Sequence, residues 1–128
     1  MIAVDTSALM AIVMNEPQAD ACMTAIEHGN RLLISAGTVA EALIVADRRN
    51  IRAEVDALIS GLGFEVVPVT ADSARRIADA YGHWGKGVHP AALNYGDCFA
   101  YAIAMEHGCP LLYVGNDFSF TDVPSVLR

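Results

Sequence analysis

The stretch RLLISAGTVAEALIVADRR (residues 31–49) combines a strand pattern with a helix pattern that follows it at once. Residues 31–35 include the apolar run LLI, which is typical of a short buried strand. Residues 38–49 are predicted to form a helix that Thr38 opens as its capping residue. A strand that leads directly into a helix is the repeating unit of parallel α/β folds.

The same alternation continues on both sides of this stretch. Strands are predicted at 1–4, 64–69 and 110–115, and helices at 6–14, 18–29, 51–63, 71–81 and 92–108. Pro68 places the 64–69 run at a strand end or a sheet edge. Thr70 is expected to cap the 71–81 helix, with Ala74, Ile77, Ala78 and Tyr81 facing inward, and the glycine-rich segment 82–91 is expected to be a loop. We therefore predict a single α/β domain over residues 1–128, in which helices cover both faces of a parallel sheet.

Composition narrows the class of protein. Of 128 residues, 54% are hydrophobic, yet no apolar run reaches the roughly 18 residues that a membrane span needs, and no signal peptide pattern opens the chain. Three cysteines without a C-x-x-C pair indicate buried thiols in a reducing compartment. A net charge of −7, with Lys86 as the only lysine, argues against a broad basic face that grips nucleic acid. We expect a cytosolic protein that handles any polyanion through local cations or a metal.

Four acids stand at equivalent places in the alternation. Asp5 follows the first strand, Glu41 is expected in the first turn of the 38–49 helix, Asp97 lies early in the 92–108 helix, and Asp117 follows the last strand. In a parallel sheet the carboxyl ends of strands and the first turns of the following helices share one edge, where ligands bind. We therefore expect the four carboxylates to converge there.

Each acid also has a structural interpretation. Asp5 would cap a helix, Thr38–Glu41 and Asn94–Asp97 have the spacing of a capping box, and Asp117 would belong to a turn. As a set they are costly, because two carboxylates about 4 Å apart repel by up to about 4 kcal/mol at an effective dielectric near 20. Proton uptake or a divalent cation would relieve that repulsion. Oxygen ligands alone favour Mg²⁺ or Mn²⁺ over Zn²⁺.

The segments VDTSAL (4–9), GKGVHPAALNYGDCFAYAIA (85–104) and PLLYVGNDFSFTD (110–122), with Glu41 between them, resemble the PIN-domain ribonucleases. The resemblance is closest to the VapC-type toxins of bacterial type II toxin–antitoxin pairs, and it runs in order from residue 2 to about residue 123. It implies a three-layer α/β/α fold and a cytoplasmic, Mg²⁺-dependent endoribonuclease, which is a hydrolase acting on phosphodiester bonds. It also implies a homodimer that a cognate VapB-type antitoxin inhibits.

The resemblance assigns roles to particular residues. Asp5, Glu41, Asp97 and Asp117 match the acidic quartet, with Asp5 and Asp97 as direct metal ligands and the other two acting through water or a second ion. Thr6 and Ser7 match the hydroxyl positions that follow the first acid. Two departures stand out, Val88 where relatives often carry a basic residue and Asn116 where a second acid is common.

Other residues have two interpretations each. Lys86 and His89 could touch RNA phosphates, whereas Trp84 is expected to cover a neighbouring helix more than to stack on a base. Arg48, Arg49 and Arg52 are expected to form a solvated helix end. The helices at 6–14, 18–29 and 51–63 could line a groove for an antitoxin helix, and the plainer alternative is a core with a dimer interface.

Three other classes of protein compete with the ribonuclease interpretation. A receiver domain needs a lysine after its fifth strand, but Lys86 lies in another loop. An aspartyl-phosphate phosphatase needs D-x-D after its first strand, and this chain has DTS. A catalytically inactive PIN-like binding module stays open, although such a scaffold would be expected to lose one of the four acids.

Overall fold

The computed structural model describes residues 1–127, and its centre is a four-stranded parallel sheet in the order β3-β2-β1-β4. The elements in chain order are β1 (Ile2–Val4), α1 (Thr6–Val13), α2 (Ala19–His28), β2 (Leu32–Ser35), α3 (Ala36–Arg48), α4 (Arg52–Gly61), β3 (Glu65–Val67), α5 (Ala71–Trp84), α6 (Tyr95–His107), β4 (Leu111–Leu112) and the 3-10 helix η1 (Asp117–Phe120). The predicted alternation and parallel sheet are confirmed.

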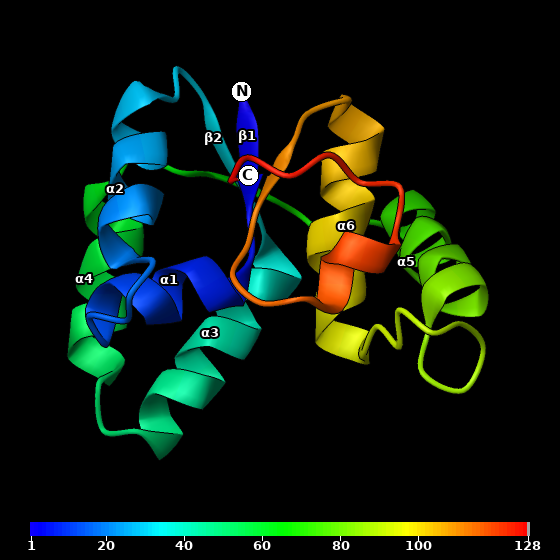
Figure 1. Ribbon diagram of the computed structural model, residues 1–128, viewed down its shortest axis with the longest axis horizontal. Helices are drawn as coiled ribbons and strands as arrows, with labels where there is room; N and C mark the ends of the chain where they lie inside the picture. The colour runs from blue at the N-terminus through cyan, green and yellow to red at the C-terminus, as the bar shows by residue number, and fades with distance from the viewer. Residues whose placement is uncertain (128) are drawn as a thin grey trace.

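Helices cover both faces of the sheet, with α1 to α4 on one side and α5 and α6 on the other (Figure 1). Side chains of a strand point alternately to opposite faces. Ile2 and Val4 accordingly pack in the cluster formed with α1 to α4, whereas Ala3 packs in the cluster formed with α5 and α6. Because both faces are covered, the inner strands are apolar at every position except Ser35 at the end of β2, which explains the LLI run of β2.

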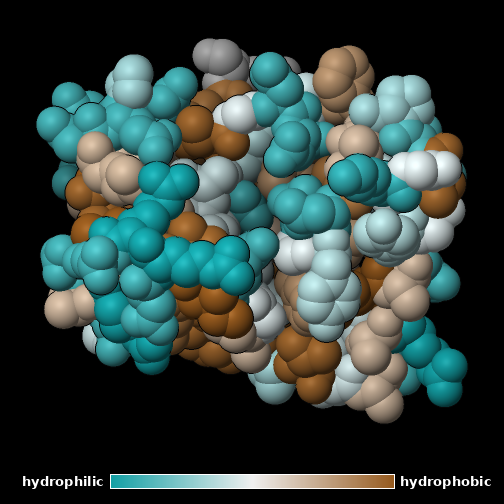
Figure 2. Space-filling model, turned by 90° about the horizontal axis from the view of Figure 1, so that it is seen from below, coloured by the Kyte–Doolittle hydropathy of each residue, from teal (hydrophilic) through white to brown (hydrophobic). Residues whose placement is uncertain are grey.

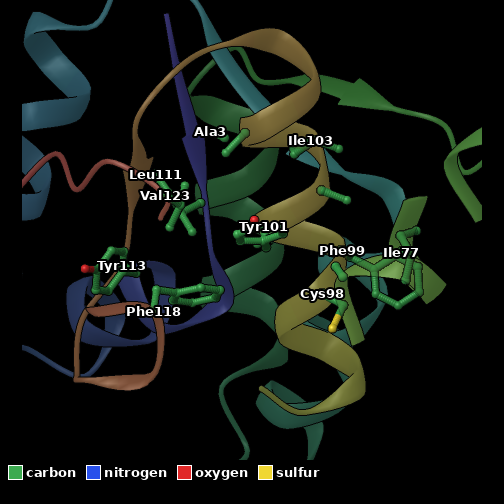
Figure 3. Close-up of a cluster of buried hydrophobic side chains, with 14 of the residues drawn as sticks. Ala3, Ile77, Cys98, Phe99, Tyr101, Ile103, Leu111, Tyr113, Phe118 and Val123 are labelled. Carbon is green, nitrogen blue, oxygen red and sulfur yellow. The ribbon is translucent and has the colours of Figure 1, made fainter. Parts of the chain in front are cut away.

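Helix α6 is the most deeply buried helix of this fold. Every residue from Asp97 to Ala104 is buried, because α6 packs against the sheet, α5 and α3 at once. Figure 3 shows its Tyr101 turned towards β1, β4 and the segment that follows β4, and its Phe99 beside Ile77 of α5. The first turn of α6 therefore sits at the carboxyl edge of the sheet, with its following turns in the core.

The start of α3 corrects one prediction. The helix begins at Ala36, and its N-cap is Ser35, whose Oγ accepts a hydrogen bond from the Gly37 N–H at 3.1 Å. Thr38 is a buried residue inside the helix and Glu41 lies in the second turn, so the two do not form a capping box. Gly37 allows this early start, because a Cβ there would lie 2.2 Å from the Phe99 ring of α6.

Helix α5 corrects a second prediction. Its buried residues are Ser73, Ile77 and Ala80, whereas Ala74, Ala78 and Tyr81 are exposed. The buried face of α5 is the one turned to α6. Which residues form that face depends on how α6 packs against α5, and the hydrophobic pattern of α5 alone does not specify it. The capping role of Thr70 is confirmed by its hydrogen bond from the Ser73 N–H at 3.2 Å.

The remaining differences concern lengths. Helix α5 continues to Trp84, so residues 82–84 of the predicted loop are helical. Strands β3 and β4 are shorter than the predicted runs 64–69 and 110–115. β3 ends before Pro68 and is an edge strand whose Glu65 and Val66 are exposed, in agreement with the effect expected of that proline. Within residues 1–127, no helix combines the length and the apolar character required to cross a membrane.

Candidate active site

Asp5 lies where β1 ends and α1 begins, and it is 4% exposed. Its Oδ2 accepts hydrogen bonds from the Ser7 N–H at 3.0 Å and from the Ser7 Oγ–H at 2.7 Å. Its other oxygen, Oδ1, is buried and has no hydrogen-bond partner among the described residues. The residue is thus a helix cap through one oxygen and presents a free acceptor through the other.

Asp97 occupies the first turn of α6 and is 7% exposed. It forms a capping box with Asn94, in which the Asp97 N–H donates to Asn94 Oδ1 at 2.8 Å and the Asn94 N–H donates to Asp97 Oδ2 at 3.0 Å. The capping interpretation of this pair is confirmed. The hydrogen bonds hold the carboxylate at the helix N-terminus, where the partial positive charge of the backbone favours an anion.

Glu41 reaches the same edge from α3. It is half-buried, and its Oε1 accepts a hydrogen bond from Thr6 Oγ1 at 2.7 Å. Its Oε2 lies against Gly96 of α6, so closely that a Cβ at position 96 would be 1.9 Å away. Thr6 and Gly96 therefore hold the Glu41 carboxylate between α1 and α6.

Asp117 is the most open of the four acids. It is exposed at the start of η1, in the segment after β4. Ser7 ties that segment to the start of the chain, because its Oγ accepts a hydrogen bond from the Val114 N–H at 3.0 Å while donating to Asp5. One hydroxyl thus orients Asp5 and anchors the segment that leads to Asp117.

The pKa values indicate how the acids affect one another. Burial raises the pKa of Asp97 to about 7; Asp5, Asp117 and Glu41 add to the rise, and the hydrogen bond from the Asn94 backbone opposes it. Burial also raises the pKa of Asp5 to about 6, with a further contribution from Glu41 and opposition from the hydrogen bonds of Ser7. The structure therefore brings the four predicted acids within electrostatic range of each other, and two of them resist ionisation there.

The arrangement suits a hard cation that keeps part of its water shell. Among residues 1–127, no three histidine, cysteine, aspartate or glutamate side chains are grouped closely enough to form a metal site by themselves. Mg²⁺ is usually held by one or two carboxylates together with several waters. Asp5 Oδ1, an oxygen acceptor without a partner, and the neighbouring Asp97 carboxylate match that donor set.

Within residues 1–127, no hydrogen bond or ion pair joins Lys86 or His89 to the four acids. Lys86 is exposed, and His89 Nδ1 accepts a hydrogen bond from the Ala91 N–H at 3.0 Å. Trp84 is half-buried and donates through Nε1 to the Tyr101 hydroxyl at 2.9 Å, which confirms the packing interpretation of this side chain.

Sequence reasoning missed Gly96. A glycine inside a helix costs about 1 kcal/mol relative to alanine, so its presence beside Asp97 signals a close approach by another group. The identity of that group, the Glu41 carboxylate, comes from a helix 55 positions earlier in the chain and follows only from the tertiary packing.

Comparisons with known proteins place the chain in a family. The PIN-domain family model matches residues 2–124. Ribonuclease VapC30 of Mycobacterium tuberculosis is 39% identical over 126 residues, which are 96% of each chain, and ribonuclease VapC42 of the same organism is 42% identical over 94% of this chain and 95% of the relative.

Solved structures confirm the three-layer fold. The M. tuberculosis toxin VapC20, described as cleaving the sarcin–ricin loop, aligns with a TM-score of 0.80 over 98% of both chains at 17% identity. A toxin–antitoxin complex from Klebsiella pneumoniae aligns with a TM-score of 0.72 at 19% identity, over 95% of this chain and 93% of that one.

Proposed function

This chain belongs to the PIN-domain family, among relatives named VapC ribonucleases, and we propose that it is a Mg²⁺-dependent endoribonuclease acting as the toxin of a toxin–antitoxin pair. The observation that carries the proposal is the pair of buried carboxylates Asp5 and Asp97 at the sheet edge, of which Asp5 keeps an acceptor oxygen without a partner. Buried charges of one sign are retained when a bound cation compensates them.

Asp5 and Asp97 would hold the metal, with Glu41 and Asp117 reaching it through water or a second ion. A bound Mg²⁺ or Mn²⁺ lowers the pKa of a coordinated water and neutralises charge on the phosphate. Glu41 would orient the attacking water and accept its proton, because Thr6 and Gly96 hold its carboxylate in one place. Ser7 would hold the Asp5 carboxylate in place through Oδ2 and leave Oδ1 free to bind the metal.

The charge of the chain supports a strict need for the cation. The chain carries a net charge of −7, and the acids of the site repel a phosphodiester in the absence of metal. Lys86 and His89, in the loop that precedes α6, would contact phosphates farther along the RNA. Cleavage would therefore stop completely when the metal is removed.

The proposed partners are a VapB-type antitoxin and a second copy of the chain, in the bacterial cytoplasm. Solved relatives include toxin–antitoxin complexes, which supports the first. The helices α1, α2 and α4 carry partly buried apolar side chains at Ile12, Val13, Ala25 and Leu58, and Leu62 directly follows α4. These side chains offer an antitoxin helix an apolar surface of the kind that accepts an amphipathic partner.

The test is cleavage of total bacterial RNA by antitoxin-free protein with Mg²⁺ or with EDTA. We expect discrete fragments with Mg²⁺ only, and none with Asp97→Asn, which keeps the size of the side chain and removes its charge. Asp72→Asn is the matched control. Asp72 also lies in the first turn of a helix, α5, but it is exposed and is not one of the four acids of the proposed site. Cleavage that survives both EDTA and Asp97→Asn would refute the mechanism, and folded wild type without activity would favour the inactive binding module.

A further inference from the structure

Tyr95, the first residue of α6, is 71% exposed, the highest value among the large hydrophobic side chains of the described chain. It is followed by Gly96, which touches Glu41, and by Asp97. Tyr95 and Asp97 are two positions apart, which is at most about 7 Å of backbone. The Tyr95 side chain therefore starts next to the proposed catalytic carboxylates. An exposed aromatic ring at this place has no role in the acid cluster itself.

The Tyr95 ring is held rather than free. The Phe99 ring, one helical turn later, meets the Tyr95 ring in an edge-to-face arrangement, with ring centroids 4.9 Å apart and an interplanar angle of 86°. Phe99 is itself 8% exposed and wedged against Gly37 of α3, where a Cβ would lie 2.2 Å from its ring. Tyr95 therefore contacts a buried aromatic side chain of the core, while most of its own surface meets solvent.

A hollow of about 390 Å³ opens beside this ring. It lies between α5 and α6, and Val69, Ala78, Tyr81, Tyr95 and Phe99 are among its lining residues. No charged side chain lines it, so it offers nothing to a phosphate and suits a flat, apolar group. Figure 2 views the end of the molecule at which α6 begins, and hydrophobic side chains reach the surface there among hydrophilic ones.

We propose that Tyr95 and this hollow form a stacking site for an unpaired RNA base next to the scissile phosphate; the proposal rests on the proposed ribonuclease function. Single-stranded RNA is recognised largely through bases that stack on aromatic side chains. Successive nucleotides of a stacked strand rise about 3.4 Å along the helix axis, so the base of a nucleotide adjacent to the one at Asp5 and Asp97 lies within reach of Tyr95. The acids would select a phosphate, and the stacking site would set which nucleotide is presented to them.

A base is favoured over a protein partner by the place of the hollow. An RNA bound for cleavage must pass the first turn of α6, whereas a second copy of the chain that covered Tyr95 in an active dimer would block the approach to Asp97. The Tyr95 hydroxyl forms no hydrogen bond within residues 1–127, so the ring alone is expected to matter.

The test combines a change in the protein with a change in the RNA. An oligonucleotide containing one cleavage site is prepared intact and with an abasic nucleotide at each position flanking the cut. For wild type, one abasic position should lower kcat/KM by about 5- to 150-fold, the range that alanine substitution of stacking residues gives per base. Tyr95→Ala should show the same loss on intact RNA and no further loss on that abasic RNA, and Tyr95→Phe should behave as wild type.

Controls separate the alternatives. Phe120→Ala removes another exposed aromatic side chain, 62% exposed, and should leave cleavage unchanged. Quenching of a 2-aminopurine placed at the sensitive position should disappear in Tyr95→Ala. Wild type that cleaves both RNAs equally would overturn the stacking site alone, and wild type that cleaves no RNA would overturn the proposed function with it. A changed oligomeric state of Tyr95→Ala by light scattering would identify the surface as a protein interface instead.

Discussion

Replacing Asp97 by asparagine should stabilise the metal-free protein at alkaline pH, although it abolishes the proposed activity. The pKa of Asp97 is raised from its ordinary value to about 7, and at 1.36 kcal/mol per pH unit this rise corresponds to about 4 kcal/mol. Asp97 is only 7% exposed, so solvent screens this effect little. The asparagine can still accept the hydrogen bond from the Asn94 N–H through its amide oxygen, so the helix cap survives.

The sign follows from the direction of the shift. Because the folded state holds the Asp97 proton more tightly than the unfolded state does, folding is favoured below pH 4, and this contribution is lost as the pH rises to about 7. Above that pH the buried charge of Asp97, together with its repulsion by Asp5, Asp117 and Glu41, destabilises the native state. Asp97→Asn should therefore match wild type near pH 4 and exceed it in stability by up to about 4 kcal/mol at pH 8.

Urea denaturation in EDTA, followed by circular dichroism at both pH values, measures the difference directly. Asp72→Asn should differ from wild type by at most about 1 kcal/mol, the range of an exposed first-turn acid, at either pH. At pH 8, Mg²⁺ should stabilise wild type, which binds it only when folded, and leave Asp97→Asn unchanged. If the Asp97→Asn difference is the same at pH 4 and pH 8, the reasoning from carboxylate burial and repulsion is wrong.

Gly96→Ala should lower Mg²⁺-dependent RNA cleavage by roughly tenfold to a hundredfold, because a Cβ 1.9 Å from Glu41 Oε2 must displace that carboxylate. Gly82→Ala is the control, because no atom lies within 4 Å of a Cβ at position 82, and it should keep full activity. Equal activity of both variants would contradict the contact between Gly96 and Glu41. Ser7→Ala should lower the free energy of unfolding by about 1–3 kcal/mol in urea, because the partly buried hydrogen bond from the Val114 N–H and one hydrogen bond to Asp5 are lost. An unchanged urea midpoint would refute this role of Ser7. Phe118→Ala, at a 2% exposed core position, should cost about 3–5 kcal/mol by the same measurement.

Local signals in the sequence predicted the parts of the site that depend on neighbouring residues. Asp5 follows a strand, and Asn94 and Asp97 have cap spacing, so their places at the ends of elements follow from short-range hydrogen bonding. The rule that parallel strands share a carboxyl edge then brings Asp5 and Asp97 to the same edge, although they are far apart in the chain.

The parts that could not be predicted depend on competition or on a distant partner. Ser35 and Thr38 are both acceptable caps, and Ser35 is used because α3 must start at the end of the strand and pack its Gly37 on Phe99. The inward face of α5 is set by α6, which no periodicity within α5 can reveal. The contact of Gly96 with Glu41 likewise exists only after two helices have packed together.

The hydrogen bond from the Val114 N–H to Ser7 has a consequence for biosynthesis. Strand β1 pairs with β4 as well as with β2, so β1 acquires its second neighbour in the sheet only after β4, which lies much later in the chain, has been synthesised. Asp5 and Glu41 emerge early, but the segment that bears Asp117 is anchored only after Val114 has docked. The cluster of four acids is therefore complete only after the segment that follows β4 has been synthesised and has docked on Ser7.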